Sequence, residues 1–161
     1  MNNFGLIDYR EEFHLKTFRR WNAIRVLCKN AKFKGGVPLQ KAAFVDFLLC
    51  NPSLLQNILV GFSRAQPVLN LEELLYQDNL EFGGALDVTD FSRTCILLVS
   101  KNYLNFEKKE GEVFLSTGYE LTLPDNDLSN RWEREIDSLQ PILSKSVNIL
   151  SSAVLGGING N

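Results

Sequence analysis

The residues of this chain that could do chemistry are few and scattered. His14 is the only histidine, so a Ser-His-Asp or Cys-His arrangement would have to be built around it, among the aromatic residues of a predicted helix. Cys28, Cys50 and Cys95 lie far apart, and none belongs to a CxxC pair that could hold zinc. Each lies in an apolar helical pattern. We therefore expect buried, reduced thiols, and a surface or core-edge position for His14.

Carboxylates and glycines also occur in pairs, but their surroundings do not favour catalysis or nucleotide binding. Glu72–Glu73, and Glu133 with Asp137, lie on helix faces that the pattern predicts to be exposed. Asp46 is the one acidic residue of an apolar segment, and a structural role for it is expected. Gly35–Gly36 lacks the spacing and the Lys-Ser/Thr pair of a phosphate-binding loop. The sequence predicts a protein that is not an enzyme, with no cofactor, no metal and no small-molecule substrate.

Length and composition predict one globular domain spanning residues 1–161. The chain is 45% hydrophobic and 22% charged, with a net charge of -2. No stretch reaches the roughly 18 apolar residues of a membrane span, and the N-terminus has neither a basic start nor an apolar signal core. We expect a cytoplasmic protein with no membrane partner.

Apolar spacing and breaker residues predict several helices before the centre of the chain. The first begins at Asp8 and Glu11 and carries a stripe of apolar residues as far as Cys28. The segment Lys34–Pro38 breaks it, with Pro38 in the first turn of the next helix. The next helix is predicted at Leu39–Cys50, and we expect it to be central because it is apolar nearly all round. Another helix follows the Asn51–Pro52 break, at Ser53–Phe62. Two more are predicted at Leu71–Gln77 and, after a break at Gly83–Gly84, at Thr89–Ser100.

A β-hairpin follows the helix at Thr89–Ser100. Tyr103, Leu104 and Phe106 form one apolar run, Val113–Leu115 form another, and a charged turn containing Gly111 joins them. A helix that leads into a hairpin resembles the closing half of a winged-helix domain. The expected fold is mostly α with a small β-hairpin, a winged-helix-like domain with helical extensions at both ends.

The C-terminal extension is predicted as one long helix over residues 128–152, kinked at Pro141 and followed by a frayed tail at 153–161. Its apolar residues follow a heptad-like pattern. Such a stripe is either intramolecular core or a surface for a partner or a second copy, and we assign it here as a docking helix. The candidate partner-binding residues are Trp132, Ile136, Leu139 and Leu143, and the stripe continues to Leu150.

Charge is distributed unevenly along the chain. Residues 10–41 contain nine basic and two acidic residues, whereas residues 42–161 contain eight basic and sixteen acidic ones. This asymmetry indicates either a face for nucleic acid or complementary surfaces that meet within the fold or between subunits, and solvated helix faces are the plain alternative. The candidate nucleic-acid-binding residues are Arg19, Arg20, Arg25, Lys29, Lys32 and Lys34, whose phosphate contacts would be salt-sensitive and independent of base sequence.

Two segments suggest a family. The run Val45–Leu55 (VDFLLCNPSLL) and the turn Leu115–Leu121 (LSTGYEL), with the helices between them, resemble the middle component of bacterial three-component ABC/SMC-type antiphage defence systems, the Lamassu-like systems. The resemblance covers Trp21–Leu123. It implies a small non-enzymatic subunit that joins an SMC-like ATPase to a nuclease-like effector subunit, and it supplies no catalytic residues.

Function is therefore expected to be that of an adaptor in an antiviral defence complex, with DNA contact through the basic N-terminal face. The alternative is a free-standing winged-helix transcription regulator that binds DNA through the helix before the hairpin. That helix offers only Arg93 to a major groove, and three glutamates offset Lys108 and Lys109 in the turn. An enzyme would instead show a turnover that is lost when His14 or Asp46 is replaced.

Overall fold

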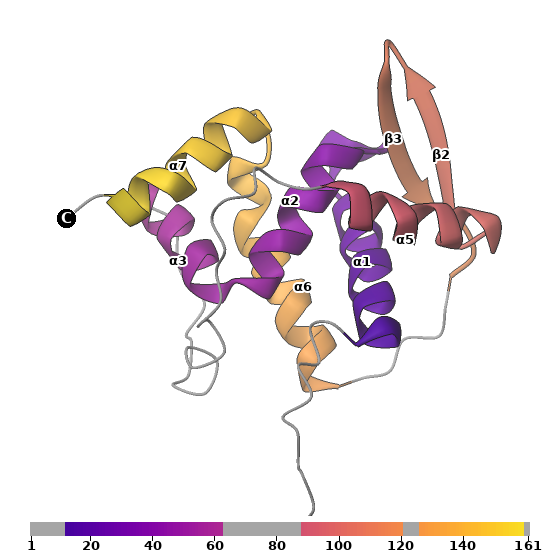
Figure 1. Cartoon of the computed structure of the whole chain (residues 1–161), viewed down its shortest axis with the longest axis horizontal. Helices are drawn as coiled ribbons and strands as arrows, with labels where there is room; N and C mark the ends of the chain where they lie inside the picture. Colours follow the sequence, from indigo (N-terminus) through magenta and orange to yellow (C-terminus); the bar gives the residue numbers. More distant parts are fainter. Residues whose placement is uncertain (1–11, 63–87, 121–125, 160–161) are drawn as a thin grey trace, which may run out of the picture.

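The structure is a computed structural model that describes residues 12–62, 88–120 and 126–159 (Figure 1). These residues form a mostly helical fold with a small antiparallel sheet, which confirms the prediction of a mostly α fold with a small β element. In chain order the elements are α1 (Phe13–Cys28), the 3-10 turn η1 (Ala31–Phe33), β1 (Val37–Pro38), α2 (Leu39–Cys50), α3 (Pro52–Gly61), α5 (Val88–Ser100), β2 (Leu104–Lys109), β3 (Glu112–Thr117), α6 (Asp127–Leu139), the 3-10 turn η2 (Gln140–Ile142) and α7 (Val147–Asn159).

The sheet has the strand order β1-β3-β2, and both pairs are antiparallel. Strands β2 and β3 form the predicted hairpin, in which Lys109 pairs with Glu112 across a two-residue turn. Both turn residues have positive φ, 51° for Glu110 and 81° for Gly111, as the right-handed twist of a hairpin favours. Figure 1 shows that this hairpin projects beyond the helices.

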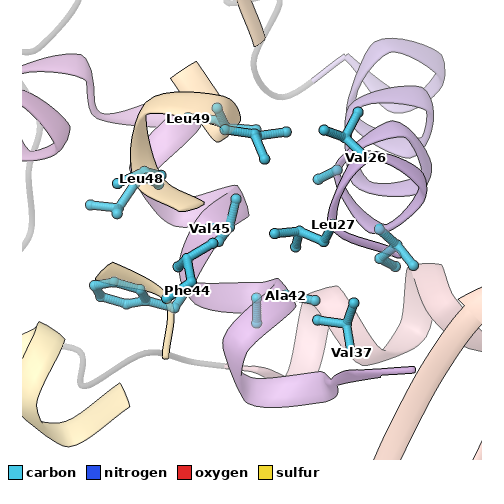
Figure 2. Packing of buried hydrophobic residues seen from close by; sticks show 14 of the residues in the cluster. Val26, Leu27, Val37, Ala42, Phe44, Val45, Leu48 and Leu49 are labelled. Atoms are coloured by element: carbon cyan, nitrogen blue, oxygen red, sulfur yellow. The ribbon is translucent and has the colours of Figure 1, made fainter. Parts of the chain in front are cut away.

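One hydrophobic core joins the helices to the base of the sheet. Helix α1 packs on α2, α5 and α6, so it is covered on several sides. Figure 2 shows Val26 and Leu27 of α1 facing Val45 and Leu49 of α2. All four side chains are buried, as is Val37 of β1. The nearly complete burial of α2 agrees with its apolar sequence.

A sharp bend separates α2 from α3. The two helix axes differ in direction by 113° across Asn51. Pro52 pushes the residue before it out of helical geometry, and Asn51 has φ -131° and ψ 73°. The predicted break is confirmed. No single helix in the described parts of the chain is long and apolar enough to cross a membrane, and α2 and α3 reach that length only together, across the bend.

The predicted C-terminal helix at 128–152 is wrong in its continuity. Helix α6 ends at Leu139, η2 carries Pro141, and α7 begins at Val147 and packs against α3. Pro141 has no N–H to continue the ladder, so the chain turns there rather than kinking. Helix α7 also continues to Asn159, through most of the segment predicted as a frayed tail.

Two smaller differences concern the first third of the chain. Helix α1 begins at Phe13, because the Glu12 side chain accepts a 2.7 Å hydrogen bond from the Leu15 N–H. Val37–Pro38 forms a strand against β3 before α2 begins, where the sequence predicted only a turn into the helix. The predicted helix start at Asp8 and Glu11, the helix at Leu71–Gln77 and the break at Gly83–Gly84 lie outside the described residues.

Candidate functional site

The first two candidate nucleic-acid-binding arginines lie inside the fold, in an ion-pair network between three helices. Arg19 is 3% exposed and its Nε donates to Asp46 Oδ1 of α2 at 2.6 Å. Arg20 is 8% exposed and its Nε donates to the other Asp46 oxygen at 3.0 Å. The Arg20 Nη1 continues to α5, donating to the Asp90 carboxylate at 2.8 Å and to Thr94 Oγ1 at 2.7 Å. These arginines bind carboxylates of their own chain.

Arg25 is occupied in the same way on the side of α6. It is 8% exposed, its Nε and Nη2 donate to Asn22 Oδ1, and its Nη2 reaches Glu133 Oε1 at 2.5 Å. The prediction that Arg19, Arg20 and Arg25 contact phosphate is therefore wrong, because α1 is packed on several sides. Each guanidinium needs a buried counter-charge, which a neighbouring helix supplies.

The three candidate lysines lie at the end of α1, and all are exposed. Lys29 caps α1, Lys32 lies in η1, and Lys34 follows η1. Among the described residues, none of the three has an ion pair. The structure thus divides the predicted basic face into a buried arginine half and an exposed lysine half.

The candidate partner-binding residues are core residues. Trp132, Ile136, Leu139 and Leu143 are all at most 3% exposed, and Leu150 of α7 is buried with them. Their heptad-like spacing reflects packing of α6 onto α1 and α2 rather than a free seam. Assigning them as a docking surface is wrong, because nothing of them is available to a partner.

A different set of apolar side chains is exposed, on α5 and the hairpin that follows it. Ile96 and Leu97 of α5 are 68% and 37% exposed, Phe106 of β2 is 60% exposed, and Tyr119 after β3 is 68% exposed. We call these four residues the α5–hairpin apolar set. The elements that carry them are joined, because α5 packs on β2 and the Tyr119 N–H donates to Asn102 O at 2.8 Å.

The sequence contained a signal for part of this set. Phe91, Cys95, Leu98 and Val99 lie near helical spacing in this segment, and all four are buried or half-buried. Ile96 and Leu97 fall outside the stripe that these four residues form, so a helix in this segment must carry them on a face other than the buried one. Attention to the residues left over by the stripe would have found them.

The residues considered for catalysis do not converge. His14 is exposed in the first turn of α1, Asp46 is committed to two arginines, and Glu133 is paired with Arg25. No group of three metal-ligating side chains occurs within residues 12–62, 88–120 and 126–159. Glu72–Glu73 lies outside the described residues.

The three cysteines are free thiols, and burial weakens the acidity of two of them. Burial is the main cause that raises the pKa of Cys95 to about 12, with opposite smaller effects from Arg20 and Asp46. Burial also raises the pKa of the half-buried Cys28, although hydrogen bonding to Thr117 opposes it. A raised pKa disfavours the thiolate, which is the nucleophilic form of cysteine.

No protein-family model, curated protein or solved structure matches the chain. Exposed apolar side chains and exposed lysines are therefore the features of the described residues that bear on function.

Proposed function

We propose that the protein is a non-enzymatic adaptor that binds a partner protein through the α5–hairpin apolar set. The observation that carries this proposal is the exposure of Ile96, Leu97, Phe106 and Tyr119 on connected elements. Four of the seven large apolar side chains that are exposed in the described residues lie on these connected elements, and exposed apolar side chains of this kind are typical of protein–protein interfaces.

A winged-helix-like arrangement supports this proposal. The chain has a first helix, a short strand, further helices, and then α5 leading directly into the hairpin, with the strand order β1-β3-β2. We propose that α5 and the hairpin are the helix and wing of such a domain. In this domain the exposed side of the helix before the wing carries two large apolar residues, Ile96 and Leu97, beside the polar ones.

The resemblance of Val45–Leu55 and Leu115–Leu121 to Lamassu-like middle components supports a specific complex. In this proposal the partners are an SMC-like ATPase and a nuclease-like effector subunit of a cytoplasmic antiviral defence system. The chain contributes contacts and no chemistry. The buried ion-pair network between α1, α2 and α5 then serves to hold the binding helix rigid.

The alternative is a free-standing transcription regulator, and the composition of α5 argues against it. A helix that reads a major groove presents Arg, Lys, Asn or Gln to base edges. The exposed side of α5 carries Arg93 together with Ile96 and Leu97. A regulator would hold one defined duplex more tightly than others at physiological salt, and replacing Arg93 would relax that preference.

A pull-down from the native cell tests the adaptor proposal. The tagged wild-type chain, recovered at moderate salt, should bring an SMC-like ATPase and an effector subunit in a fixed ratio, identified by mass spectrometry. The variant Ile96→Ser/Leu97→Ser/Phe106→Ser should lose both, because it removes the apolar contact while leaving the core intact.

The matched control removes exposed apolar side chains at the opposite end of the domain. Val60 of α3 is 54% exposed and Ile149 of α7 is 53% exposed. The variant Val60→Ser/Ile149→Ser should recover the partners as the wild type does, and circular dichroism should show native helix content in every variant. Recovery of the chain alone, or equal recovery by the α5–hairpin variant, would contradict the proposal.

A further inference from the structure

Four of the lysines that have no ion pair among the described residues lie near one another at one corner of the fold. Lys29, Lys32, Lys34 and Lys41 lie within thirteen residues that contain no acidic residue, and among the described residues none of the four has an ion pair. We call these four residues the lysine corner. The other basic residues of the same part of the chain behave differently, since Lys16, Arg19, Arg20 and Arg25 all have carboxylate partners.

The corner is built from the end of α1, η1 and the first turn of α2. Gly35 is exposed and has open space where a side chain would start, although the next residue, Gly36, lies against Phe114 and Leu115 of β3. Lys41 is half-buried, with its Nζ 5.6 Å from the centre of the Phe33 ring. Burial lowers the pKa of Lys41, while Glu112 raises it and the charge of Lys32 lowers it. Lys32 and Lys41 are therefore close enough to repel each other.

Helix stability does not explain this arrangement. Lys29 lies at the C-terminus of α1, where a cation is favourable. Lys41, by contrast, lies in the first turn of α2, where the helix dipole opposes a cation. Glu112 offsets part of the charge of Lys41, but Lys32 lies near it as well, and a bound anion would stabilise both lysines.

The hairpin contributes little to this charge. Lys109 is paired with Glu107 at 3.1 Å, and Glu110 and Glu112 offset the remaining lysine. An anionic partner would therefore bind on the α1–α2 side of the sheet and leave the α5–hairpin apolar set free.

We infer that the lysine corner binds the phosphate backbone of a nucleic-acid duplex without reading its bases. Four lysines spread over three elements match repeated charges better than one compact anion, because lysine is a flexible point charge rather than a fixed fork. Single strands are bound on exposed aromatic side chains, and the one aromatic residue of this segment, Phe33, is buried. Phosphate contacts alone give affinity and no base preference.

This inference deepens the proposed function, because an adaptor with this corner would touch duplex held by its ATPase partner. Duplex binding is tested on the purified full chain without the ATPase. A negative result then contradicts the lysine-corner inference alone and leaves the adaptor proposal untouched. Fluorescence anisotropy of a labelled DNA duplex is measured over a range of salt concentrations, with two unrelated sequences. The wild type should bind both equally at low salt and weaken steeply as salt rises.

The decisive variant is Lys29→Gln/Lys32→Gln/Lys34→Gln, compared with a charge-matched control. The control, Lys101→Gln/Arg134→Gln/Lys145→Gln, removes three exposed cations from other elements. The corner variant should bind about tenfold or more weakly and lose about 2 to 3 from the slope of log affinity against log salt, whereas the control should keep most of both.

Three results would overturn the inference. The first is no binding by the wild type at low salt, and the second is equal loss in the corner variant and its control. The third is displacement of the duplex by polyglutamate as effectively as by unlabelled duplex at equal charge, which would indicate an acidic protein partner instead. Far-UV circular dichroism of the variants shows that lost binding is not lost folding.

Discussion

Asp46 of α2 forms ion pairs with two arginines of α1. It is buried, and its two oxygens accept hydrogen bonds from Arg19 and Arg20 at 2.6 Å and 3.0 Å. A buried ion pair adds little net stability over apolar packing, but removing one partner leaves a buried charge uncompensated. The stability of the fold should therefore be sensitive to loss of the Asp46 carboxylate.

Replacing Asp46 with Asn should destabilise the fold by about 3–5 kcal/mol, because Arg19 and Arg20 would lose the charge that offsets their desolvation. The measurement is the free energy of unfolding from urea titration followed by circular dichroism. Asp137→Asn, on the exposed side of α6, is the control and should change stability by at most about 0.5 kcal/mol. Equal effects of the two variants would show that the network is not structural.

Asp90 gives the network a pH dependence. Burial raises its pKa, but the hydrogen bonds and charges of Arg20 and Lys16 together outweigh burial, so the pKa of Asp90 lies below its ordinary value of 3.8. A lowered folded pKa contributes stability that is present above pH 3.8 and is lost as the pH falls through the folded value. Wild type should therefore exceed Asp90→Asn in stability at neutral pH, and the gap should close on the acid side of pH 3.8.

Urea midpoints of both proteins between neutral and acid pH measure this gap. A gap that stays constant over the whole range would contradict the proposed role of the Asp90 carboxylate.

The arginines show why sequence alone misplaced the site. An apolar stripe predicts one buried face, and Arg19, Arg20 and Arg25 lie outside it. Arg19 and Arg20 pair with Asp46, which lies at most 27 residues away in the sequence. Arg20 also contacts Asp90, 70 residues away, and Arg25 pairs with Glu133, 108 residues away. Only the packing of α2, α5 and α6 around α1 brings these residues together, and no local pattern contains that information.

At the scale of elements, the junction between α5, β2 and the end of β3 fixes the hairpin to the body. Gly118 N–H donates to Tyr103 O at 2.9 Å, and Trp21 Nε1 donates to the same carbonyl at 3.1 Å. Asn102 makes the turn with φ 64°. A side chain at Gly118 would begin 2.2 Å from Asn102 O, so only glycine fits.

Gly118→Ala should therefore cost about 1–3 kcal/mol or more, since the obstacle is backbone that cannot rotate away. Gly35→Ala is the matched control, because nothing lies within 4 Å of its new methyl group, and it should be within about 0.5 kcal/mol of wild type. Thermal unfolding of the two variants side by side decides the point. Similar melting temperatures would contradict the close approach at Gly118.

The elements that could be predicted are those with strong local signals. The bounds of α2 match the prediction because an apolar run lies between Pro38 and Asn51–Pro52. The hairpin was predicted from two apolar runs and Gly111. Strand β1 was missed because it has two residues, one of them proline, and exists only through its pairing with β3. The sequence predicted a kink at Pro141 but not two separate helices. The position of α7 depends on its packing against α3, which the local sequence does not contain.

At the scale of the whole molecule, one core connects the N-terminal and C-terminal helices. Phe18 lies between the two tryptophans, with ring centroids 6.0 Å from Trp21 of α1 and 6.3 Å from Trp132 of α6. Both tryptophans are buried. The helices predicted to be extensions are therefore part of the body.

A single core predicts a single unfolding transition. The variants Trp21→Phe and Trp132→Phe each keep one tryptophan, which reports on α6 or α1 respectively. Within each variant, the urea midpoint from fluorescence should coincide with the midpoint from far-UV circular dichroism. An earlier fluorescence change for the Trp132 reporter would show that α6 unfolds separately.

The projecting hairpin carries exposed side chains along most of β2, and its fully buried side chains lie at its base. Leu104 and Leu115 at its base are buried, whereas residues 105–109 of β2 are exposed. Substitutions near the tip meet few folding constraints beyond the positive-φ turn. Natural variation can therefore accumulate there at little cost, so that descendants of one ancestral body could acquire different binding preferences by changing about a dozen residues.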